Sequence, residues 1–454
     1  MTLAVVILAA GQGSRMKSAV PKVLHPVAGT PMLGHVITAA RCLQPVQIIV
    51  VYGHVGDRVR KAFPNPDLTW VEQAEQLGTG HAVQQALPII NANVDRILVL
   101  YGDVPLIQPT TLQALLANSV DSLSLLTVSL DDPAGYGRIQ RDTNQQVIGI
   151  IEQKDATPEQ QAIQEVNTGI MVLPAAHAKG WLERLSNHNQ QNEYYLTDLV
   201  AMAVQANLTI NVSQPVKPIE AFGVNDRKQL ATIEREKQRM QADQLMLDGV
   251  TLQDPARFDL RGTLQHGQDC TIEPNVIMEG DVHLGDRVHI GAHTILRNVT
   301  IADDVTILDQ CVIEDAMIGS GSQVGPFARL RPGTRLAETT RVGNFVEIKQ
   351  SRIGVGSKVN HLAYIGDTEI GQGANIGAGT ITCNYDGANK HKTMIEDDVF
   401  VGSNSALVAP VTLGKGATIG AGSVITQNTP SGALSLTRGN PVKIPNWQRP
   451  KKHT

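Results

Sequence analysis

The sequence predicts two domains of different fold class, an α/β domain over residues 1–226 and an all-β parallel β-helix over residues 250–437. In the first part, short apolar runs alternate with helix-like stretches, which is the order expected of a mostly parallel sheet covered by helices on both faces. In the second part, aliphatic residues recur every six residues and are often followed by small or turn-forming residues. Such a repeat cannot bury its apolar face alone, so its coils must stack on one another.

Four apolar runs in the first part are short and nearly continuous, as strands buried on both faces should be. They are Leu3–Leu8, Gln47–Tyr52, Arg96–Tyr101 and Leu123–Val128, with helix-like stretches such as Pro31–Arg41 and Thr110–Asn118 between them. Ligands of such sheets bind beyond the carboxyl ends of the strands. Two polar loops follow strand ends here, Gly11–Arg15 and Gly102–Asp103.

The six-residue beat is clearest near the C-terminus and slips to five residues at three places, Ile313 to Ile318, Ile348 to Ile353 and Ile365 to Ile370. Its aliphatic positions include Ile272, Met278, Leu284, Ile290, Leu296, Val324, Leu330, Leu336, Val342, Ile348, Ile395, Val401, Leu407, Leu413, Ile419 and Ile425. The slips exclude a perfectly regular rod.

A charged helix is expected over residues 227–249, between the two domains. Asp226 and Gln229 have the spacing of a capping box, and Gly249 is a suitable stop. Residues 438–454 carry three prolines and a basic end, and we expect an extended, solvated tail.

The composition is that of a soluble globular protein, with 42 % hydrophobic and 18 % charged residues. A net charge of -5 argues against a broad surface for nucleic acid or anionic membrane. The four cysteines have neither metal-ligand spacing nor a disulfide framework. No apolar run approaches the roughly 18 residues of a membrane span, and no basic residue precedes the first run, so we expect a strand there instead of a signal peptide and a cytoplasmic protein without membrane insertion.

The loop after the first strand, within Leu8–Met16, has the glycine spacing of neither a Walker A motif nor a dinucleotide fingerprint. A strand, a Gly-rich turn and a following helix would still present backbone amides and a helix N-terminus to a phosphate. Arg15 and Lys22 could add positive charge. By themselves, such a turn is often only a turn, and an aspartate after a strand, such as Asp103, is more often a helix cap.

Polar residues interrupt the aliphatic beat between Arg331 and Tyr385. Arg331, Lys349 and Asn375 are spaced by 18 and 26 residues, so stacking could bring them to neighbouring corners, where the two cations could bind a phosphate. His361 has the side chain best suited to take a proton near neutral pH, because an unperturbed imidazole has a pKa of about 6.5. A lone histidine on a coil is usually a surface or packed residue, however. β-Helices of this kind also occur in carbonic-anhydrase-like and structural proteins, so the beat predicts a fold and not a reaction.

The string Leu-Ala-Ala-Gly-x-Gly-Ser-Arg-Met followed by Pro21 and Lys22 resembles the signature of nucleotide-sugar pyrophosphorylases, which have a Rossmann-like nucleotidyltransferase domain. The resemblance implies that Arg15 and Lys22 act in catalysis on the phosphates of UTP, and that Asp103 and Asn225 hold Mg²⁺. The nucleotide and sugar contacts that it implies are Leu8, Ala9, Ala10, Gly11, Lys22, Gln73, Gly78, Thr79, Tyr101, Gly102, Asp103, Gly137, Glu152, Asn167 and Asn225. The implied reaction is in-line attack of a sugar 1-phosphate on the α-phosphorus of UTP, with loss of pyrophosphate.

With the stretch Gly377–Gly387, the whole chain resembles the bifunctional N-acetylglucosamine-1-phosphate uridyltransferase/glucosamine-1-phosphate acetyltransferases. The resemblance implies a left-handed coil, a homotrimer, and His361 as the general base that transfers acetyl from acetyl-CoA to glucosamine 1-phosphate, before UTP-dependent uridylyl transfer to N-acetylglucosamine 1-phosphate. It implies sugar-phosphate contacts at Arg331, Lys349, Tyr364, Asn375, Asn384 and Tyr385, and acetyl-CoA contacts at Ala378, Ser403, Ala421 and Arg438.

Two other interpretations of the chain are an enzyme with one decayed domain and a regulatory or scaffolding protein. The decayed-domain interpretation predicts loss of Lys22, Asp103, Asn225 or His361, and all four are present. Intact motifs in both halves likewise argue against a scaffold. Direct acetyl transfer needs no acyl-enzyme, so we expect Cys383 to serve packing and not catalysis.

Overall fold

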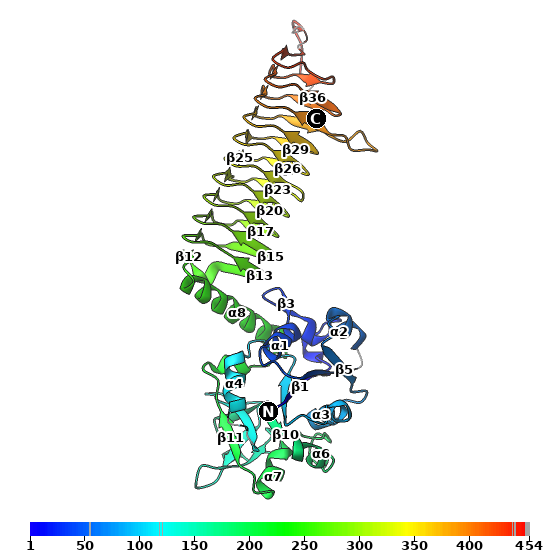
Figure 1. Cartoon of the computed structure of the whole chain (residues 1–454), viewed down its shortest axis with the longest axis vertical. Helices are drawn as coiled ribbons and strands as arrows, with labels where there is room; N and C mark the ends of the chain where they lie inside the picture. Colours follow the sequence, from blue (N-terminus) through cyan, green and yellow to red (C-terminus); the bar gives the residue numbers. More distant parts are fainter. Residues whose placement is uncertain (54–55, 118, 120, 438, 440–441, 450–454) are drawn as a thin grey trace. The chain divides into compact units, whose positions relative to one another are not determined.

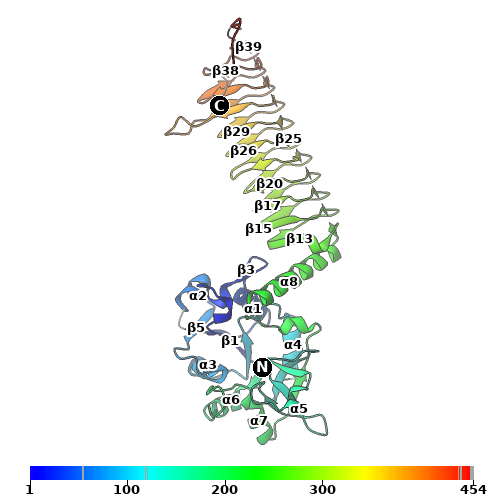
Figure 2. The ribbon, with the colours of Figure 1, turned by 180° about the vertical axis from the view of Figure 1, so that it is seen from behind.

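The computed structural model describes residues 1–53, 56–117, 119, 121–437, 439 and 442–449. The chain divides into two compact units, residues 1–237 and 238–454. The charged helix predicted over residues 227–249 is α8 (Arg227–Leu247), and the boundary between the units falls inside it. Figure 1 and Figure 2 show the ribbon from opposite sides.

The first unit is built on a sheet with the strand order β11-β7-β10-β6-β1-β4-β5. All neighbours in this path are parallel except β10, which runs antiparallel to both β6 and β7. The strands are β1 (Leu3–Ala9), β4 (Gln47–Tyr52), β5 (Leu68–Glu72), β6 (Arg96–Tyr101), β7 (Leu123–Ser129), β10 (Glu165–Pro174) and β11 (Ile210–Ser213), with β8 (Arg138–Arg141) and β9 (Val147–Ile151) attached through β10 and β2 (Pro26–Val27) paired with β3 (Thr30–Pro31). The prediction of a mostly parallel sheet is confirmed.

Helices cover both faces of this sheet, because alternate residues of each strand point to opposite sides. Val5 and Ile7 pack with α1 and α4, whereas Val6 packs with α3, α6 and α7. The helices are α1 (Met32–Arg41), α2 (Gly56–Ala62), α3 (Thr79–Ala86), α4 (Pro109–Ala117), α5 (Pro158–Gln161), α6 (Ala175–Leu182) and α7 (Asp198–Gln205), with 3₁₀ turns η1 (Ser14–Met16), η2 (Lys22–Leu24), η3 (Leu87–Ile89) and η4 (Pro218–Ala221).

The helix expected directly after the Gly-rich turn is wrong. Only the 3₁₀ turn η1 follows the loop, and the first α-helix begins at Met32. Gly13 and Lys17 flank η1 with left-handed φ values of 64° and 48°, a conformation that a right-handed helix cannot continue through. A helix N-terminus therefore does not contribute to anion binding at this loop.

The second unit is a parallel β-helix, whose stacked coils are visible in Figure 1. One face is a sheet of β12 (Thr251–Leu252), β14 (Thr271–Ile272), β16 (His289–Ile290), β19 (Thr306–Ile307), β22 (Gln323–Val324), β25 (Arg341–Asn344), β28 (Lys358–His361), β31 (Asn375–Ile376), β34 (Phe400–Val401), β37 (Thr418–Ile419) and β39 (Leu434–Ser435). The second sheet comprises β13 (Phe258–Gln265), β15 (Val276–Leu284), β17 (Ile295–Arg297), β18 (Thr300–Ile301), β20 (Val312–Glu314), β21 (Met317–Ile318), β23 (Arg329–Leu330), β24 (Arg335–Leu336), β26 (Glu347–Lys349), β27 (Arg352–Ile353), β29 (Tyr364–Gly366), β30 (Thr368–Ile370), β32 (Ile381–Cys383), β33 (Thr393–Ile395), β35 (Ala406–Val408), β36 (Val411–Leu413) and β38 (Val424–Ile425). The turn η5 (Pro255–Arg257) precedes β13. The left hand of the coil stays an expectation from the resemblance.

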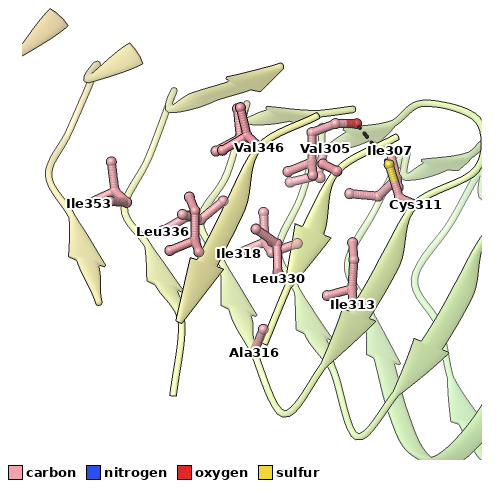
Figure 3. Close-up of a cluster of buried hydrophobic side chains, with 14 of the residues drawn as sticks. Val305, Ile307, Cys311, Ile313, Ala316, Ile318, Leu330, Leu336, Val346 and Ile353 are labelled. Carbon is pink, nitrogen blue, oxygen red and sulfur yellow. Dashed lines mark hydrogen bonds between the residues drawn. The ribbon is translucent and has the colours of Figure 1, made fainter. Parts of the chain in front are cut away.

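The aliphatic side chains of the six-residue beat fill the interior of the coils and are all buried. Figure 3 shows part of this core, with Ile313, Leu330 and Leu336 pointing inward from successive strands. The prediction from periodicity is confirmed. One coil is longer than its neighbours, because Glu369 pairs with Met394 whereas Leu330 pairs with Ile348. The extra residues lie between β32 and β33. No helix among the described residues is long and apolar enough to cross a membrane.

Candidate functional sites

A cavity of about 530 Å³ lies beyond the carboxyl ends of β1 and β6 in the first unit, where a parallel sheet is expected to bind its ligand. Ten of the residues predicted to contact nucleotide line it: Leu8, Ala9, Ala10, Gly11, Lys22, Gln73, Gly78, Thr79, Tyr101 and Asp103. Gly102 lies at the same edge, where its N–H donates to the Leu8 carbonyl at 2.9 Å. The structure thus gathers residues from four separate motifs around one space.

The Gly-rich loop folds back against Lys22 beside this cavity. A Cβ atom at Gly13 would lie 2.7 Å from the Lys22 Cβ, so only glycine permits the approach. Arg15 Nη2 donates to Asn225 Oδ1 at 3.0 Å, and Lys22 forms an ion pair with Asp103 while its Nζ lies 3.3 Å from the same Asn225 oxygen. The two cations predicted for phosphate and the two oxygen ligands predicted for metal therefore form one cluster.

Asp103 and Asn225 are suitable ligands for Mg²⁺. Their adjacency is fixed by the backbone, because the Val224 N–H donates to the Asp103 carbonyl at 3.0 Å. A carboxylate and an amide oxygen are hard donors, and only two of them leave coordination positions for water and substrate phosphate. In the part of the chain that the structure describes, no group of three or more His, Cys, Asp or Glu side chains could hold a metal ion. The donor set thus fits an ion that arrives with a phosphate ligand.

The segment predicted to recognise the base is held rigidly. Gln73 is buried, and its Nε2 donates to the Gly78 carbonyl at 3.1 Å. Gly78 has a φ of 108°, and a Cβ there would lie 2.7 Å from the Tyr194 carbonyl oxygen. Gly80 N–H donates to that carbonyl at 2.8 Å. This edge of the cavity is therefore fixed before any ligand binds.

The predicted sugar residues lie together but do not line the same cavity. The Asn167 N–H donates to the Gly137 carbonyl at 2.8 Å, and a Cβ at Gly137 would lie 3.4 Å from the Glu152 carboxylate. Thr197 donates a hydrogen bond to Glu152 at 3.0 Å, and Glu152 lines a smaller cavity of about 190 Å³. Burial raises the pKa of Glu152. The Asn167 Oδ1 is buried without a hydrogen-bond partner in the described chain, as expected of a group that awaits a ligand.

Tyr101 connects the two groups of residues. Burial, with smaller contributions from the charges of Glu152 and Asp103, raises the pKa of the Tyr101 hydroxyl, which therefore stays protonated. Gly169, with a φ of 85°, allows the ring to pass, since a Cβ there would lie 2.5 Å from it. The nucleotide cavity and the sugar residues are thus neighbours across one tyrosine.

A larger cavity of about 1000 Å³ lies at the opposite edge of the same sheet. It is lined by residues such as Asp95, His177 and Glu183 and contains none of the predicted site residues. It also lies away from the carboxyl ends of the parallel strands. Residue chemistry therefore favours the smaller cavity as the site.

A column of charged side chains runs along one face of the β-helix. Arg261, Glu279, Arg297 and Glu314 stand opposite one another on successive coils and alternate in sign. Arg261 pairs with Glu279 at 3.0 Å, and Arg297 pairs with Glu314 at 2.6 Å. This alternation compensates every charge in the lower part of the column.

The alternation ends at the predicted acetyltransferase site. The pairing of Leu330 with Ile348 places Arg331 directly beside Lys349, so two cations are adjacent. Glu347 lies 2.8 Å from Arg331, and Asp367 lies 3.9 Å from Lys349. Lys349 also lowers the pKa of Lys390, which projects toward it from the extra residues between β32 and β33. Three cations therefore gather where a phosphate is expected to bind.

His361 is exposed at the end of β28, one coil above Asn344. Its Nδ1 lies 2.8 Å from Asn344 Oδ1. An amide oxygen can only accept a hydrogen bond, so Nδ1 carries the proton and the lone pair is on Nε2. This is the tautomer in which the ring can act as a base toward an external ligand.

Tyr364 and Asn384 converge over Gly366. A Cβ at Gly366 would lie 2.6 Å from the Tyr364 hydroxyl and 2.8 Å from Asn384 Nδ2. Asn384 donates a hydrogen bond to Asp367, the carboxylate that also faces Lys349. Tyr385 instead turns into its own hairpin, where its hydroxyl donates to the Gly387 carbonyl at 2.6 Å.

Small residues form a ledge that continues the corner of His361 on later coils. The Gly379 N–H donates to the His361 carbonyl, and the Asn404 N–H donates to the Ala378 carbonyl at 2.7 Å. The Gly422 N–H donates to the Ser403 carbonyl in the same way. Ala378, Ser403 and Ala421, all predicted to contact acetyl-CoA, thus stand in one column above the histidine, whereas Arg438 lies outside the described residues.

The prediction that Asn375 lies near Arg331 and Lys349 is wrong within one chain. Asn375 is on β31, where it pairs with Lys358 and Phe400 in the other sheet. One coil above Lys349 lies Gly366, and Asn375 comes after the following corner. Stacking in whole coils therefore places it on a different face.

Sequence reasoning assigned no role to Asn344, Lys390 or Thr197. Asn344 was accessible in principle, because it precedes His361 by one coil length. Lys390 lies in extra residues whose path the repeat does not predict, and Thr197 meets Glu152 only through tertiary folding.

The chain matches models of three known protein families. Residues 5–191 match the MobA-like NTP transferase domain, residues 261–353 match the GMPPB C-terminal domain, and residues 392–427 match the hexapeptide repeat of succinyl-transferase. The matches fall on the sheet that carries the nucleotide cavity and on the coils of the β-helix.

Curated relatives match over almost the whole chain. A bifunctional protein GlmU from Azotobacter vinelandii is 57 % identical over 453 residues, which cover 100 % of this chain and 99 % of that protein. Proteins of the same name from Nitrosomonas eutropha and Pseudomonas putida are 56 % and 55 % identical, with coverage of 99 % and 100 % of this chain and of 98 % and 99 % of theirs. A solved nucleotidyl transferase from Methanothermobacter thermautotroptrophicus aligns with 53 % of this chain and 99 % of its own at 19 % identity, and its TM-score of 0.40 is too low to support an argument.

Proposed function

The chain belongs to the family of bifunctional GlmU proteins, and from this we propose that it catalyses two consecutive steps of UDP-N-acetylglucosamine synthesis, a precursor for cell-wall and lipopolysaccharide assembly. The β-helix acetylates glucosamine 1-phosphate, and the α/β unit then transfers a uridylyl group to the product. The observation that carries the proposal is the presence of two separate charged clusters, Arg15–Lys22–Asp103–Asn225 in one unit and Arg331–Lys349 beside His361 in the other.

Acetyl transfer proceeds by direct attack. The amine of glucosamine 1-phosphate gives a proton to His361 Nε2 as its nitrogen forms a bond to the thioester carbonyl carbon of acetyl-CoA. The carbon–sulfur bond then breaks, and the imidazolium returns the proton to the departing CoA sulfur. Arg331 and Lys349 bind the sugar phosphate, and the small-residue ledge of Ala378 and Ser403 gives room for the CoA arm.

Uridylyl transfer is an in-line displacement at phosphorus. A phosphate oxygen of N-acetylglucosamine 1-phosphate attacks the α-phosphorus of UTP, and the bond to pyrophosphate breaks. Arg15 and Lys22 stabilise the charge that develops on the phosphate oxygens. Mg²⁺, held by Asp103 and Asn225, would supply further charge neutralisation and orientation of the phosphates. Gln73 and Gly78 bind the base, and Glu152 and Asn167 bind the sugar.

A homotrimer is the assembly that we propose for the acetyltransferase. Asn375 lies on a different face from Arg331 and Lys349, so a neighbouring copy is needed to bring these residues to one substrate. An exposed apolar corner formed by Phe327, Phe345 and Leu362 supports assembly through the β-helix. The substrates are soluble metabolites, and we propose the cytoplasm as the location.

The two activities can be separated by mutation, because their residues lie in different units. Asp103→Ala should abolish UTP-dependent pyrophosphate release and leave thiol release from acetyl-CoA intact, and His361→Ala should do the reverse. Loss of both activities in either variant would refute two independent sites. Incubation with glucosamine 1-phosphate, acetyl-CoA, UTP and Mg²⁺, with each omitted in turn and products identified by mass, tests the overall function against a one-activity enzyme or a scaffold.

A further inference from the structure

Arg227 occupies a position that is electrostatically unfavourable for its helix. It is the first residue of α8, Lys228 follows it, and no acidic residue lies in the first turn. The N-terminus of a helix carries a partial positive charge, so two cations there cost stability. Asp226 caps the helix by accepting a hydrogen bond from the Gln229 N–H at 2.8 Å. The helix is therefore closed without Arg227, whose placement must be explained by other contacts.

The Arg227 guanidinium contacts both segments that carry the phosphate-binding cations. Its Nε donates to the Met16 carbonyl at 3.3 Å, and Met16 directly follows Arg15. Its Nη1 lies 3.3 Å from Nδ1 of His25, the residue that ends η2 and accordingly the turn that begins with Lys22.

These contacts are made to parts of the chain that have little freedom to move. The Met16 side chain is buried, and only 5 % of the His25 surface is exposed. The His25 N–H donates to the Lys22 carbonyl at 3.2 Å. Burial, and secondly the charge of Arg227, lower the pKa of His25, so the ring is neutral and its Nδ1 can accept from the guanidinium.

Arg227 is also tied to Asn225, the predicted metal ligand two residues earlier. The Asn225 N–H donates to Gln229 Oε1 at 2.7 Å, so Asn225 is part of the structure that begins α8. A movement of this helix start relative to the Gly-rich loop would change the distance of Asn225 from Arg15 and Lys22.

We propose that Arg227 is a positioning residue for uridylyl transfer, which holds Arg15, Lys22 and Asn225 in one arrangement. The inference rests on the proposed function. Arg227 acts through Met16 and His25 and does not itself touch substrate. Because displacement of a reacting group by about 1 Å can cost about 100-fold in rate, release of this contact should lower kcat by about 10- to 100-fold.

Arg227→Met in the full-length chain tests the proposal, with Lys228→Met as the matched control. Both variants remove one positive charge from the same helix turn, but only the first removes the contacts to Met16 and His25. We expect Arg227→Met to lower kcat for uridylyl transfer with a smaller change of KM for UTP, and to leave acetyl transfer unchanged. Lys228→Met should keep both activities within about twofold of wild type.

Several outcomes overturn the proposal. Equal kcat values for Arg227→Met and Lys228→Met would show that the contacts do not matter, and a change confined to KM would show a binding role instead. If Arg227→Met lowers the melting temperature of the first unit below the assay temperature, Arg227→Lys decides, since it keeps the charge and at most one of the two contacts. Its kcat should then be intermediate, and a wild-type kcat would contradict the proposal. A wild-type protein that acetylates but transfers no uridylyl group would instead refute the proposed function.

Discussion

Lys22 and Asp103 form an ion pair at the edge of the nucleotide cavity, with 12 % and 17 % of their side chains exposed. The Lys22 Nζ also lies 3.3 Å from Asn225 Oδ1. The lysine thus contacts both oxygens that we assign to the metal ion. A cation from the protein and a cation from solution compete for the same ligands unless a triphosphate draws the lysine toward itself.

Removal of this competitor should strengthen metal binding in the absence of nucleotide. For Lys22→Met we expect Mn²⁺ to bind without UTP about tenfold more tightly than to wild type, which corresponds to about 1.4 kcal/mol. Uridylyl transfer should fall in the same variant, because the phosphates lose a cation. Titration with Mn²⁺ followed by electron paramagnetic resonance measures the affinity directly.

Lys17→Met is the control for this prediction. Lys17 is an exposed cation on the same loop, so its removal changes the general electrostatics but not the contact with Asp103. An equal gain in Mn²⁺ affinity in both variants would mean that long-range charge, and not competition for Asp103, weakens metal binding.

Asn344 should matter to acetyl transfer through the orientation of His361. Asn344→Ala removes the acceptor of the His361 Nδ1 proton, which lies 2.8 Å away. The loss of one hydrogen bond of about 1–1.5 kcal/mol corresponds to a decrease of about tenfold in kcat, smaller than the loss for His361→Ala. Thiol release from acetyl-CoA measures it, and uridylyl transfer by the same preparation shows whether the chain is folded. Unchanged acetyl transfer would exclude Asn344 as the residue that sets the tautomer.

The repeat and the alternation of apolar runs were sufficient to predict both folds, because burial alone decides them. Ile348 and Leu413 must point inward wherever the coils stack, and they are buried. The motifs around Gly11 and Asp103 also met in one cavity, because parallel strands end at the same edge.

What sequence could not predict depends on local conformation and on side chains that meet only after folding. The left-handed residues Gly13 and Lys17 ended the helix expected after the loop. A spacing of 26 residues did not show that Asn375 had passed a corner onto another face. The contacts of Arg227 with Met16 and His25 join residues about 200 positions apart, and no local pattern indicates them.

Glu152 should make the stability of the first unit dependent on pH. Burial raises its pKa, so the folded protein holds the proton more tightly than the unfolded chain. The neutral carboxyl therefore contributes stability below the unfolded pKa of about 4.3, and this contribution is lost as pH rises through the raised folded pKa. Glu152→Gln removes this loss, so the melting temperature of the variant should exceed that of wild type at pH 7.5, by a difference that shrinks toward pH 4.5.

Thermal unfolding between about pH 4.5 and 7.5 tests this expectation, with Glu183→Gln as a control whose melting temperature should follow wild type. A difference that is the same at every pH would exclude the ionisation of Glu152 as its cause. Uridylyl transfer should be lower in Glu152→Gln, because we assign this carboxylate to the sugar.

Phe327, Phe345 and Leu362 form the corner that we expect to lie between copies of the chain. They are 43 %, 56 % and 62 % exposed, and the rings of the two phenylalanines stack with centroids 5.2 Å apart. All three have left-handed φ values between 52° and 57°, which bulky residues adopt only at a cost, whereas the same corner of earlier coils carries His293 and Gln310. Phe345→Ser should therefore shift the mass measured by light scattering from trimer toward monomer at micromolar concentration. Acetyl transfer should fall with assembly, because Asn375 and Arg331 then no longer share a substrate, while uridylyl transfer persists. Val355→Ser, an exposed change at another corner, should leave both the mass and the activities as in wild type. A Phe345→Ser protein with the wild-type mass would place the contact between copies elsewhere.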